Sequence, residues 1–253
     1  MHEIIPYKQH GSTCVICCML MLLEYYEIIP KAIKYNESKL FKKLKSKYME
    51  GTPFSAACWY LSKENLYCEL VHSEEHIFKN DGYLNEESFN ELMEEYNLWC
   101  KYCEEKGAKI SNGIDIDISF LTGKISEDYK IILAGKVDDY LHAIVLEKYC
   151  DNKFVVCDPL MKDKTILSEE DVMNFMNTPL GKWCICVKER HIDWYAFLVV
   201  ILLFFLFHCK LYVITHVLYE NQAFLNNLYI IVVFEDCYEI VLLVSYRPLY
   251  IKR

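Results

Sequence analysis

Hydrophobic and polar positions divide the first 190 residues into a helical part and a later part made of strands. An almost wholly apolar run predicts a buried helix over Ser12–Tyr26, and the Ser and Thr at its start are candidate caps. A second helix is expected over Thr52–Ser62, and Glu86–Lys106 predicts a long acidic amphipathic helix. Leu66–His72, between these two helices, is typical of a strand.

Strands follow in the second part, where β-branched and aromatic runs alternate with turn residues. The four predicted strands are Lys130–Val137, Leu141–Tyr149, Lys153–Asp158 and Lys182–Lys188. Between the last two, Ser168 is expected to cap a short helix, with Asp171 at the capping-box position. Helices followed by antiparallel strands are typical of an α+β fold.

The hydrophobic pattern changes after residue 190. Residues 191–253 hold only 5 acidic and 4 basic side chains and are dominated by Leu, Ile, Val, Phe and Tyr. Within them, residues 194–218 contain one certain charge, Lys210, and are long enough to form a transmembrane helix. We therefore expect a domain over residues 1–190, a candidate transmembrane helix over 191–218 and a hydrophobic tail over 219–253. A buried helix of a soluble protein is the alternative for the apolar stretch.

The tail contains a second apolar run, Leu228–Tyr246, which is interrupted by Glu235, Asp236 and Glu239. Three acids at its centre would be costly in hydrocarbon. The run is therefore expected to form two short strands around a turn and not a second membrane span.

Composition and charge argue against some classes of protein. The chain has 36 acidic and 27 basic residues, a formal net charge of −9, and 53% hydrophobic residues. The hydrophobic content excludes a disordered acidic segment, and the negative balance argues against non-specific nucleic-acid binding. A lysine-rich run, with seven lysines and one glutamate between Lys31 and Lys47, is expected to be a solvated face, as is the acidic helix.

The chain has 13 cysteines, an odd number without a short repeat, which does not suit a disulfide framework. No secretory signal pattern opens the sequence. Both features are typical of a reducing compartment, so we expect a membrane-associated protein with a cytoplasmic N-terminal domain, or else a cytoplasmic protein. Twelve of the cysteines are interpreted as packing residues.

The remaining cysteine, Cys14, belongs to a constellation with catalytic potential. It lies at the start of the apolar helix, where free N–H groups and the helix dipole stabilise a thiolate. Its backbone N–H and the side-chain amide of Gln9 are candidate oxyanion donors. His142 opens one predicted strand and Asp158 ends the next, so a hairpin can bring them together, with Asp158 orienting the imidazole that exchanges a proton with Cys14.

A zinc site is an alternative reading of the same cysteine. Cys14-x-x-Cys17 and Cys100-x-x-Cys103 could supply four thiolates. However, one pair lies in a buried helix and the other in an amphipathic one, and no glycine-turned knuckle surrounds either. We therefore expect neither a metal nor a cofactor.

Two segments resemble a known family. Tyr7-Lys-Gln-His-Gly-Ser-Thr-Cys14, followed by an apolar helix that ends in Glu24-Tyr-Tyr26, resembles the Peptidase C39-like group, the papain-fold cysteine peptidases that process bacteriocin leader peptides after a double glycine. Leu141-His-Ala-Ile-Val-Leu146 and Phe154-Val-Val-Cys-Asp158-Pro159 are similar to the His strand and the Asp-Pro strand of that family. The resemblance covers roughly residues 4–188.

The resemblance implies a papain-like α+β fold and a cysteine peptidase that cleaves a peptide or protein substrate through a thioester acyl-enzyme. It carries the catalytic roles to Cys14, His142 and Asp158, and the oxyanion role to Gln9. Where the family usually has glycine after the nucleophile, this chain has Val15. Two alternatives stay open, namely a weak or inactive peptide-binding module and a thiol acyltransferase on the same fold.

Overall fold

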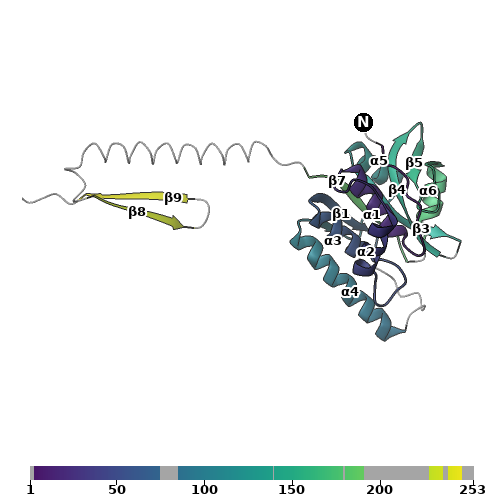
Figure 1. Cartoon of the computed structure of the whole chain (residues 1–253), viewed down its shortest axis with the longest axis horizontal. Coiled ribbons are helices and arrows are strands. Elements are labelled where there is room, and N and C mark those ends of the chain that lie inside the picture. Colours follow the sequence, from purple (N-terminus) through teal and green to yellow (C-terminus); the bar gives the residue numbers. More distant parts are fainter. Residues whose placement is uncertain are drawn as a thin grey trace, which may run out of the picture. The chain divides into compact units, whose positions relative to one another are not determined.

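The structure is a computed structural model that describes residues 3–74, 85–138, 140–178 and 180–190, together with the backbone of residues 228–235 and 239–246. The chain divides into two compact units, Met1–Arg190 and His191–Arg253. The described helices of the first unit (Figure 1) are α1 Cys14–Tyr25, α2 Lys34–Leu44, α3 Phe54–Lys63, α4 Glu86–Glu105, α5 Ile118–Ser126 and α6 Glu169–Met176. Its described strands are β1 Leu66–His72, β2 Lys109–Ser111, β3 Lys130–Val137, β4 Tyr140–Cys150, β5 Lys153–Cys157, β6 Thr165–Ser168 and β7 Trp183–Glu189.

One mixed sheet organises the first unit. Its seven strands lie in the order β2-β1-β7-β3-β4-β5-β6. Neighbouring strands are antiparallel except at one edge, where β1 and β2 run parallel. The expected antiparallel sheet is therefore mixed, because the long helix α4 separates β1 from β2 and a crossover of this length allows parallel pairing.

Helices cover both faces of the sheet. One hydrophobic cluster joins α1 and α3 to sheet residues such as Ile132 and Val145, and a second joins α5 and α6 to their strand neighbours Ile131 and Leu146. Alternate residues along each strand thus supply opposite clusters, as the period of a strand requires. The result is a three-layer mixed α/β unit in which α1 and α3 lie on one face and α5 and α6 on the other.

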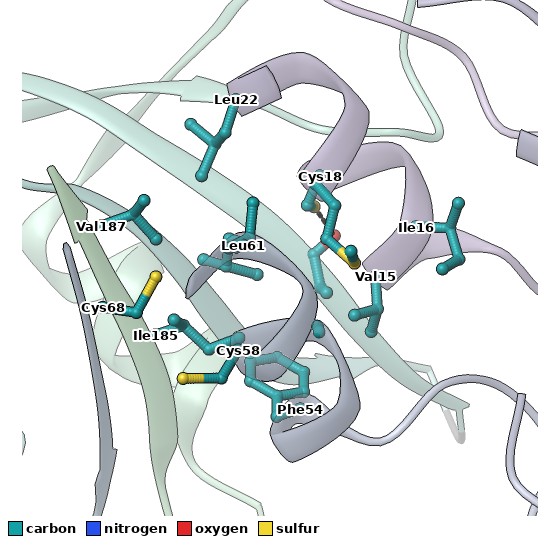
Figure 2. Close-up of a cluster of buried hydrophobic side chains, with 14 of the residues drawn as sticks. Val15, Ile16, Cys18, Leu22, Phe54, Cys58, Leu61, Cys68, Ile185 and Val187 are labelled. Atoms are coloured by element: carbon teal, nitrogen blue, oxygen red, sulfur yellow. Dashed lines mark hydrogen bonds between the residues drawn. The ribbon is translucent and has the colours of Figure 1, made fainter. Parts of the chain in front are cut away.

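Helix α1 is buried along its centre, as the apolar run predicted. Residues 15–23 are all buried, and Val15 is only 7% exposed. The helix begins at Cys14, two residues later than predicted, and its N-cap residue Thr13 makes no capping hydrogen bond through its side chain. Figure 2 shows the cluster in which α1 packs, including Val15, Cys18, Leu22, Phe54, Leu61, Cys68, Ile185 and Val187. A regular buried helix therefore accommodates the valine that follows Cys14.

Most of the other predicted elements are present with small shifts of their ends. The strands Leu66–His72 and Lys130–Val137 have the predicted bounds, and α3 begins at Phe54 and not at the Thr-Pro pair before it. The capping box of α6 is confirmed, since Ser168 and Asp171 exchange side-chain and backbone hydrogen bonds.

The interpretation of the lysine-rich run as only a solvated face was incomplete. Its lysines are exposed, but the run forms helix α2, which buries Leu40, Leu44 and the carboxylate of Glu37. The other elements that the sequence did not predict are the short strands β2 and β6 and helix α5.

In the second unit, the described residues are the antiparallel strands β8 Leu228–Glu235 and β9 Glu239–Tyr246, which confirms the two strands predicted there. The candidate transmembrane helix over residues 191–218 lies outside the described residues. Among the residues that are described, none of the helices is long and apolar enough to cross a membrane.

Candidate active site

Cys14 is the first residue of α1 and is half-buried. The next two cysteines of the helix, Cys17 and Cys18, are fully buried, and burial raises the pKa of both thiols. They therefore stay protonated and out of reach of solvent. No side chain caps α1, so the N–H groups of its first turn lie without a side-chain partner next to Cys14.

His142 lies on β4, directly opposite Gly135 of β3, and only 7% of it is exposed. Its Nε2 lies 2.7 Å from Oδ1 of Asp158. Cys14 also acts on the same ring, because it is among the groups that raise the pKa of His142. Because Asp158 engages Nε2, Nδ1 is the ring nitrogen that the carboxylate does not occupy.

A tight hairpin brings His142 and Asp158 together. Asp151 and Asn152, with φ of 52° and 58°, form the turn between β4 and β5, and both residue types tolerate this left-handed conformation. In the resulting register Val145 pairs with Cys157, so that His142 and Asp158 lie toward the same end of the two strands. The sequence had left this register open.

The pKa of His142 reflects two opposing influences. Burial of the ring lowers the pKa, but the interactions with Asp158 and Cys14 outweigh burial and raise it from 6.5 to about 9. The pKa of Asp158 moves the other way, since its bonds to His142 and to the Leu160 N–H lower it despite partial burial. Near neutral pH the pair is therefore an imidazolium and a carboxylate.

Asp158 is fixed by its own turn as well as by His142. The Leu160 N–H donates to Oδ1 of Asp158 at 2.8 Å, and the Met161 N–H donates to the Asp158 backbone carbonyl at 2.9 Å. The carboxylate oxygen that faces the imidazole is thus held by the main chain. This geometry resists rotation of the carboxylate away from the ring.

Gln9 lies in the extended segment that leads into α1. Its backbone N–H donates to the carbonyl of Pro159 at 2.8 Å, which attaches this segment to the turn that carries Asp158. Its side-chain oxygen is buried and has no hydrogen-bond partner among the described residues. This unpaired atom is the acceptor of the amide, whereas an oxyanion would be held by its NH2 group.

Glu37 is the residue of this region that sequence reasoning missed. It lies on α2, is 2% exposed, and accepts hydrogen bonds from Tyr7, His10 and Thr13, all in the segment before Cys14. A single acid among seven lysines gave no signal of burial, because burial here depends on the contact between α2 and a distant segment.

The two CxxC motifs have separate surroundings. The Cys17 thiol contacts the Thr13 hydroxyl, whereas the Cys103 thiol donates to the carbonyl of Ser55. Within residues 3–74, 85–138, 140–178 and 180–190, no three His, Cys, Asp or Glu side chains are grouped as metal ligands. The interpretation of twelve cysteines as packing residues was wrong for Cys150, which is exposed at the end of β4.

The chain was compared with protein families, curated proteins and solved structures. No protein-family model matches the chain, and no curated protein matches it. Among solved structures, the chain is similar to the peptidase domain of Streptococcus ComA, a bifunctional ABC transporter involved in a quorum-sensing pathway, with a TM-score of 0.42 and 12% sequence identity. The match covers 74% of this chain and 100% of that domain.

Proposed function

We propose that the first unit is a cysteine peptidase of papain-like fold, resembling the C39-like leader-processing peptidases, and that it cleaves a peptide or protein substrate. Cys14 is the nucleophile, His142 the general base and acid, and Asp158 the carboxylate that orients the imidazole. The observation that carries the proposal is the 2.7 Å contact between Nε2 of His142 and the Asp158 carboxylate, on a ring whose pKa Cys14 also raises.

The first half of the reaction forms a thioester. In the resting pair the proton of the Cys14 thiol lies on His142 as the imidazolium, and the Cys14 thiolate attacks the carbonyl carbon of the scissile peptide bond. The backbone N–H of Cys14 and the side-chain amide of Gln9 hold the oxyanion of the tetrahedral intermediate. The imidazolium of His142 then donates its proton to the leaving amine as the C–N bond breaks.

The second half releases the enzyme. A water molecule gives a proton to the now neutral His142 and attacks the thioester carbonyl. The C–S bond breaks, the acid product leaves, and Cys14 again pairs with an imidazolium. Asp158 keeps Nδ1 of the ring aimed at the sulfur in both halves, because its carboxylate holds Nε2.

A hollow beside the segment that leads to Cys14 offers room for a substrate side chain away from the scissile bond. Its volume is about 350 Å³, and it lies between the segment His10–Thr13 and α2, with Phe41 and Glu50 among its lining residues. We assign this hollow to the substrate because Thr13, the residue before Cys14, is among its lining residues. Both an apolar ring and charged groups line it, so it provides contacts beyond the scissile bond.

The test is cleavage of an unbiased peptide mixture by the full chain, with products identified by mass spectrometry. We expect cleavage at a restricted set of peptide bonds, and we expect Cys14→Ser to abolish it because an alcohol is a much weaker nucleophile in this setting. Cys150→Ser is the matched control, since it removes an exposed thiol at the far end of β4. Equal cleavage by the Cys14→Ser variant, or no cleavage by the unmodified chain, would overturn the proposal.

A further inference from the structure

Glu37 binds the segment that leads to Cys14 at four points. Its carboxylate accepts hydrogen bonds from the Tyr7 hydroxyl at 2.9 Å, the His10 N–H at 2.8 Å and the Thr13 hydroxyl at 2.5 Å, and Nδ1 of His10 lies 2.8 Å away. These contacts use both carboxylate oxygens. Burial raises the pKa of Glu37, but these bonds outweigh burial and lower it, so the group is a carboxylate at neutral pH.

The residues that Glu37 holds surround the two candidate oxyanion donors. Tyr7 and His10 lie on either side of Gln9, and Thr13 directly precedes Cys14. Residues 3–13 belong to no helix or strand, so a ladder of backbone hydrogen bonds does not fix their path. Glu37, which lies on α2, holds this segment in place through its hydrogen bonds.

Thr13 shows what this arrangement does to α1. As the N-cap residue, its hydroxyl would ordinarily accept a hydrogen bond from an N–H of the first helical turn. Here the hydroxyl donates to Glu37 and the helix has no side-chain cap. The N–H groups of the first turn of α1 are therefore left for a ligand. An uncapped helix is less stable, and a purely structural role of Thr13 would not require this loss.

We propose that Glu37 is a positioning residue, which rests on the peptidase function proposed above. It fixes the segment from Tyr7 to Thr13 so that the amide of Gln9 and the uncapped N–H of Cys14 face the same substrate oxygen. All of its lone-pair positions are used within the protein, so it neither accepts a hydrogen bond from substrate nor transfers a proton, although its side chain is among those that line the hollow described above.

The experiment separates acylation of Cys14 from its alkylation in the full chain. Acylation by p-nitrophenyl acetate passes through an oxyanion, whereas alkylation by iodoacetamide does not and depends only on the thiolate. We expect Glu37→Ala to slow acylation by about tenfold or more, the order expected for a misplaced oxyanion donor, while alkylation changes little. Glu37→Gln should recover most of the rate, because its amide can accept from His10 and Thr13 and donate to Tyr7.

Glu69→Ala is the matched control. Glu69 is also buried, and its carboxylate binds Lys109, Ser111 and Lys124, none of which lies in the segment before Cys14. Its loss tests the general effect of deleting a buried carboxylate. We expect the control to lower the unfolding temperature with equal effects on acylation and alkylation.

Several outcomes would overturn the positioning role while leaving the peptidase proposal intact. These are unchanged acylation in folded Glu37→Ala, a parallel loss of both rates, or no recovery with Glu37→Gln. If Glu37→Ala does not fold, Thr13→Val decides, since it removes one of the four contacts and should reproduce the selective loss of acylation in smaller measure. Failure of the peptidase proposal looks different, because unmodified protein would then show no acylation of Cys14 and no response to His142→Ala.

Discussion

The charge state of His142 is the property of the site on which the proposed chemistry depends most. A buried imidazole without polar partners would be neutral, but the Asp158 carboxylate and the Cys14 thiol reverse the effect of burial. The imidazolium is the form that donates a proton to a leaving amine. A pKa of about 9 keeps the ring charged near neutral pH, which suits the general-acid role proposed for it.

This charge predicts an alkaline limit for the proposed reaction. In the folded protein the pKa of His142 is raised from 6.5 to about 9. The ring therefore keeps its proton above the pKa that it has in the unfolded chain and loses it near pH 9. We expect peptide hydrolysis to fall as pH rises through about 9. The His142–Asp158 interaction should contribute its full stabilisation below about pH 6.5, and this contribution should be lost as pH rises through about 9. A pH profile of kcat/KM and of the unfolding temperature measures both.

Asp158→Asn is the control for this profile. It removes the partner charge that raises the pKa of His142, so the alkaline limb should move to lower pH and the rate should drop by at least about 100-fold. An alkaline limb that stays in place in this variant would show that another group sets it.

Individual residues differ in how far the sequence could predict them. Cys14, His142 and Asp158 were singled out because their order and element types agreed; the structure places His142 and Asp158 in contact, and the catalytic role of the three stays a prediction. Glu37 was missed because its burial depends on a contact with a segment 24 to 30 positions away. Such contacts leave no local pattern.

The packing of α6 against β3 supports the position of His142 at the level of elements. Gly135 pairs with His142 across the two strands, and Phe175 of α6 lies over Gly135 and meets the imidazole edge-on, with ring centroids 6.3 Å apart. A Cβ on Gly135 would collide with both the ring and the backbone oxygen of Phe175. Glycine is therefore what lets α6 approach the strand.

Gly135→Ala should destabilise the protein by about 1–3 kcal/mol, the cost of overpacking a close contact. Gly123→Ala is a matched control in α5, where the added Cβ meets no atom within 4 Å, and it should stabilise the helix by up to about 1 kcal/mol. Urea unfolding of the two variants measures the difference. Equal free energies of unfolding would contradict the close packing of α6 on β3.

Elements were predicted best where one local signal dominated. The β-branched runs of β3 and the capping box of α6 each carry enough information in a few residues. Helix α2 was hidden by its lysines, and the three-residue strand β2 exists because β1 offers it a parallel partner. Those elements depend on tertiary contacts that no window of sequence contains.

The whole molecule separates into units of different composition. Residues 1–190 hold 31 acidic and 23 basic side chains around two hydrophobic clusters, one on each face of the sheet. Residues 191–253 hold most of the chain's uninterrupted apolar sequence. Membrane attachment through residues 194–218 stays a prediction from that sequence.

Phase partition tests this prediction. We expect the full chain to enter the detergent phase, because residues 194–218 can match the thickness of a bilayer. A truncated chain of residues 1–190 keeps both hydrophobic clusters and should stay in the aqueous phase. A full chain that behaves like the truncated one would contradict the prediction.

The proposed peptidase function depends most directly on the reactivity of Cys14. The decisive measurement is the rate of iodoacetamide labelling at Cys14 near neutral pH, resolved by mass spectrometry, with exposed Cys150 of the same chain as the internal reference. We predict that Cys14 reacts faster than Cys150 although it is less exposed, and that His142→Ala removes this advantage because the thiolate loses its imidazolium partner. Labelling of Cys14 no faster than that of Cys150, unchanged by His142→Ala, would contradict the account.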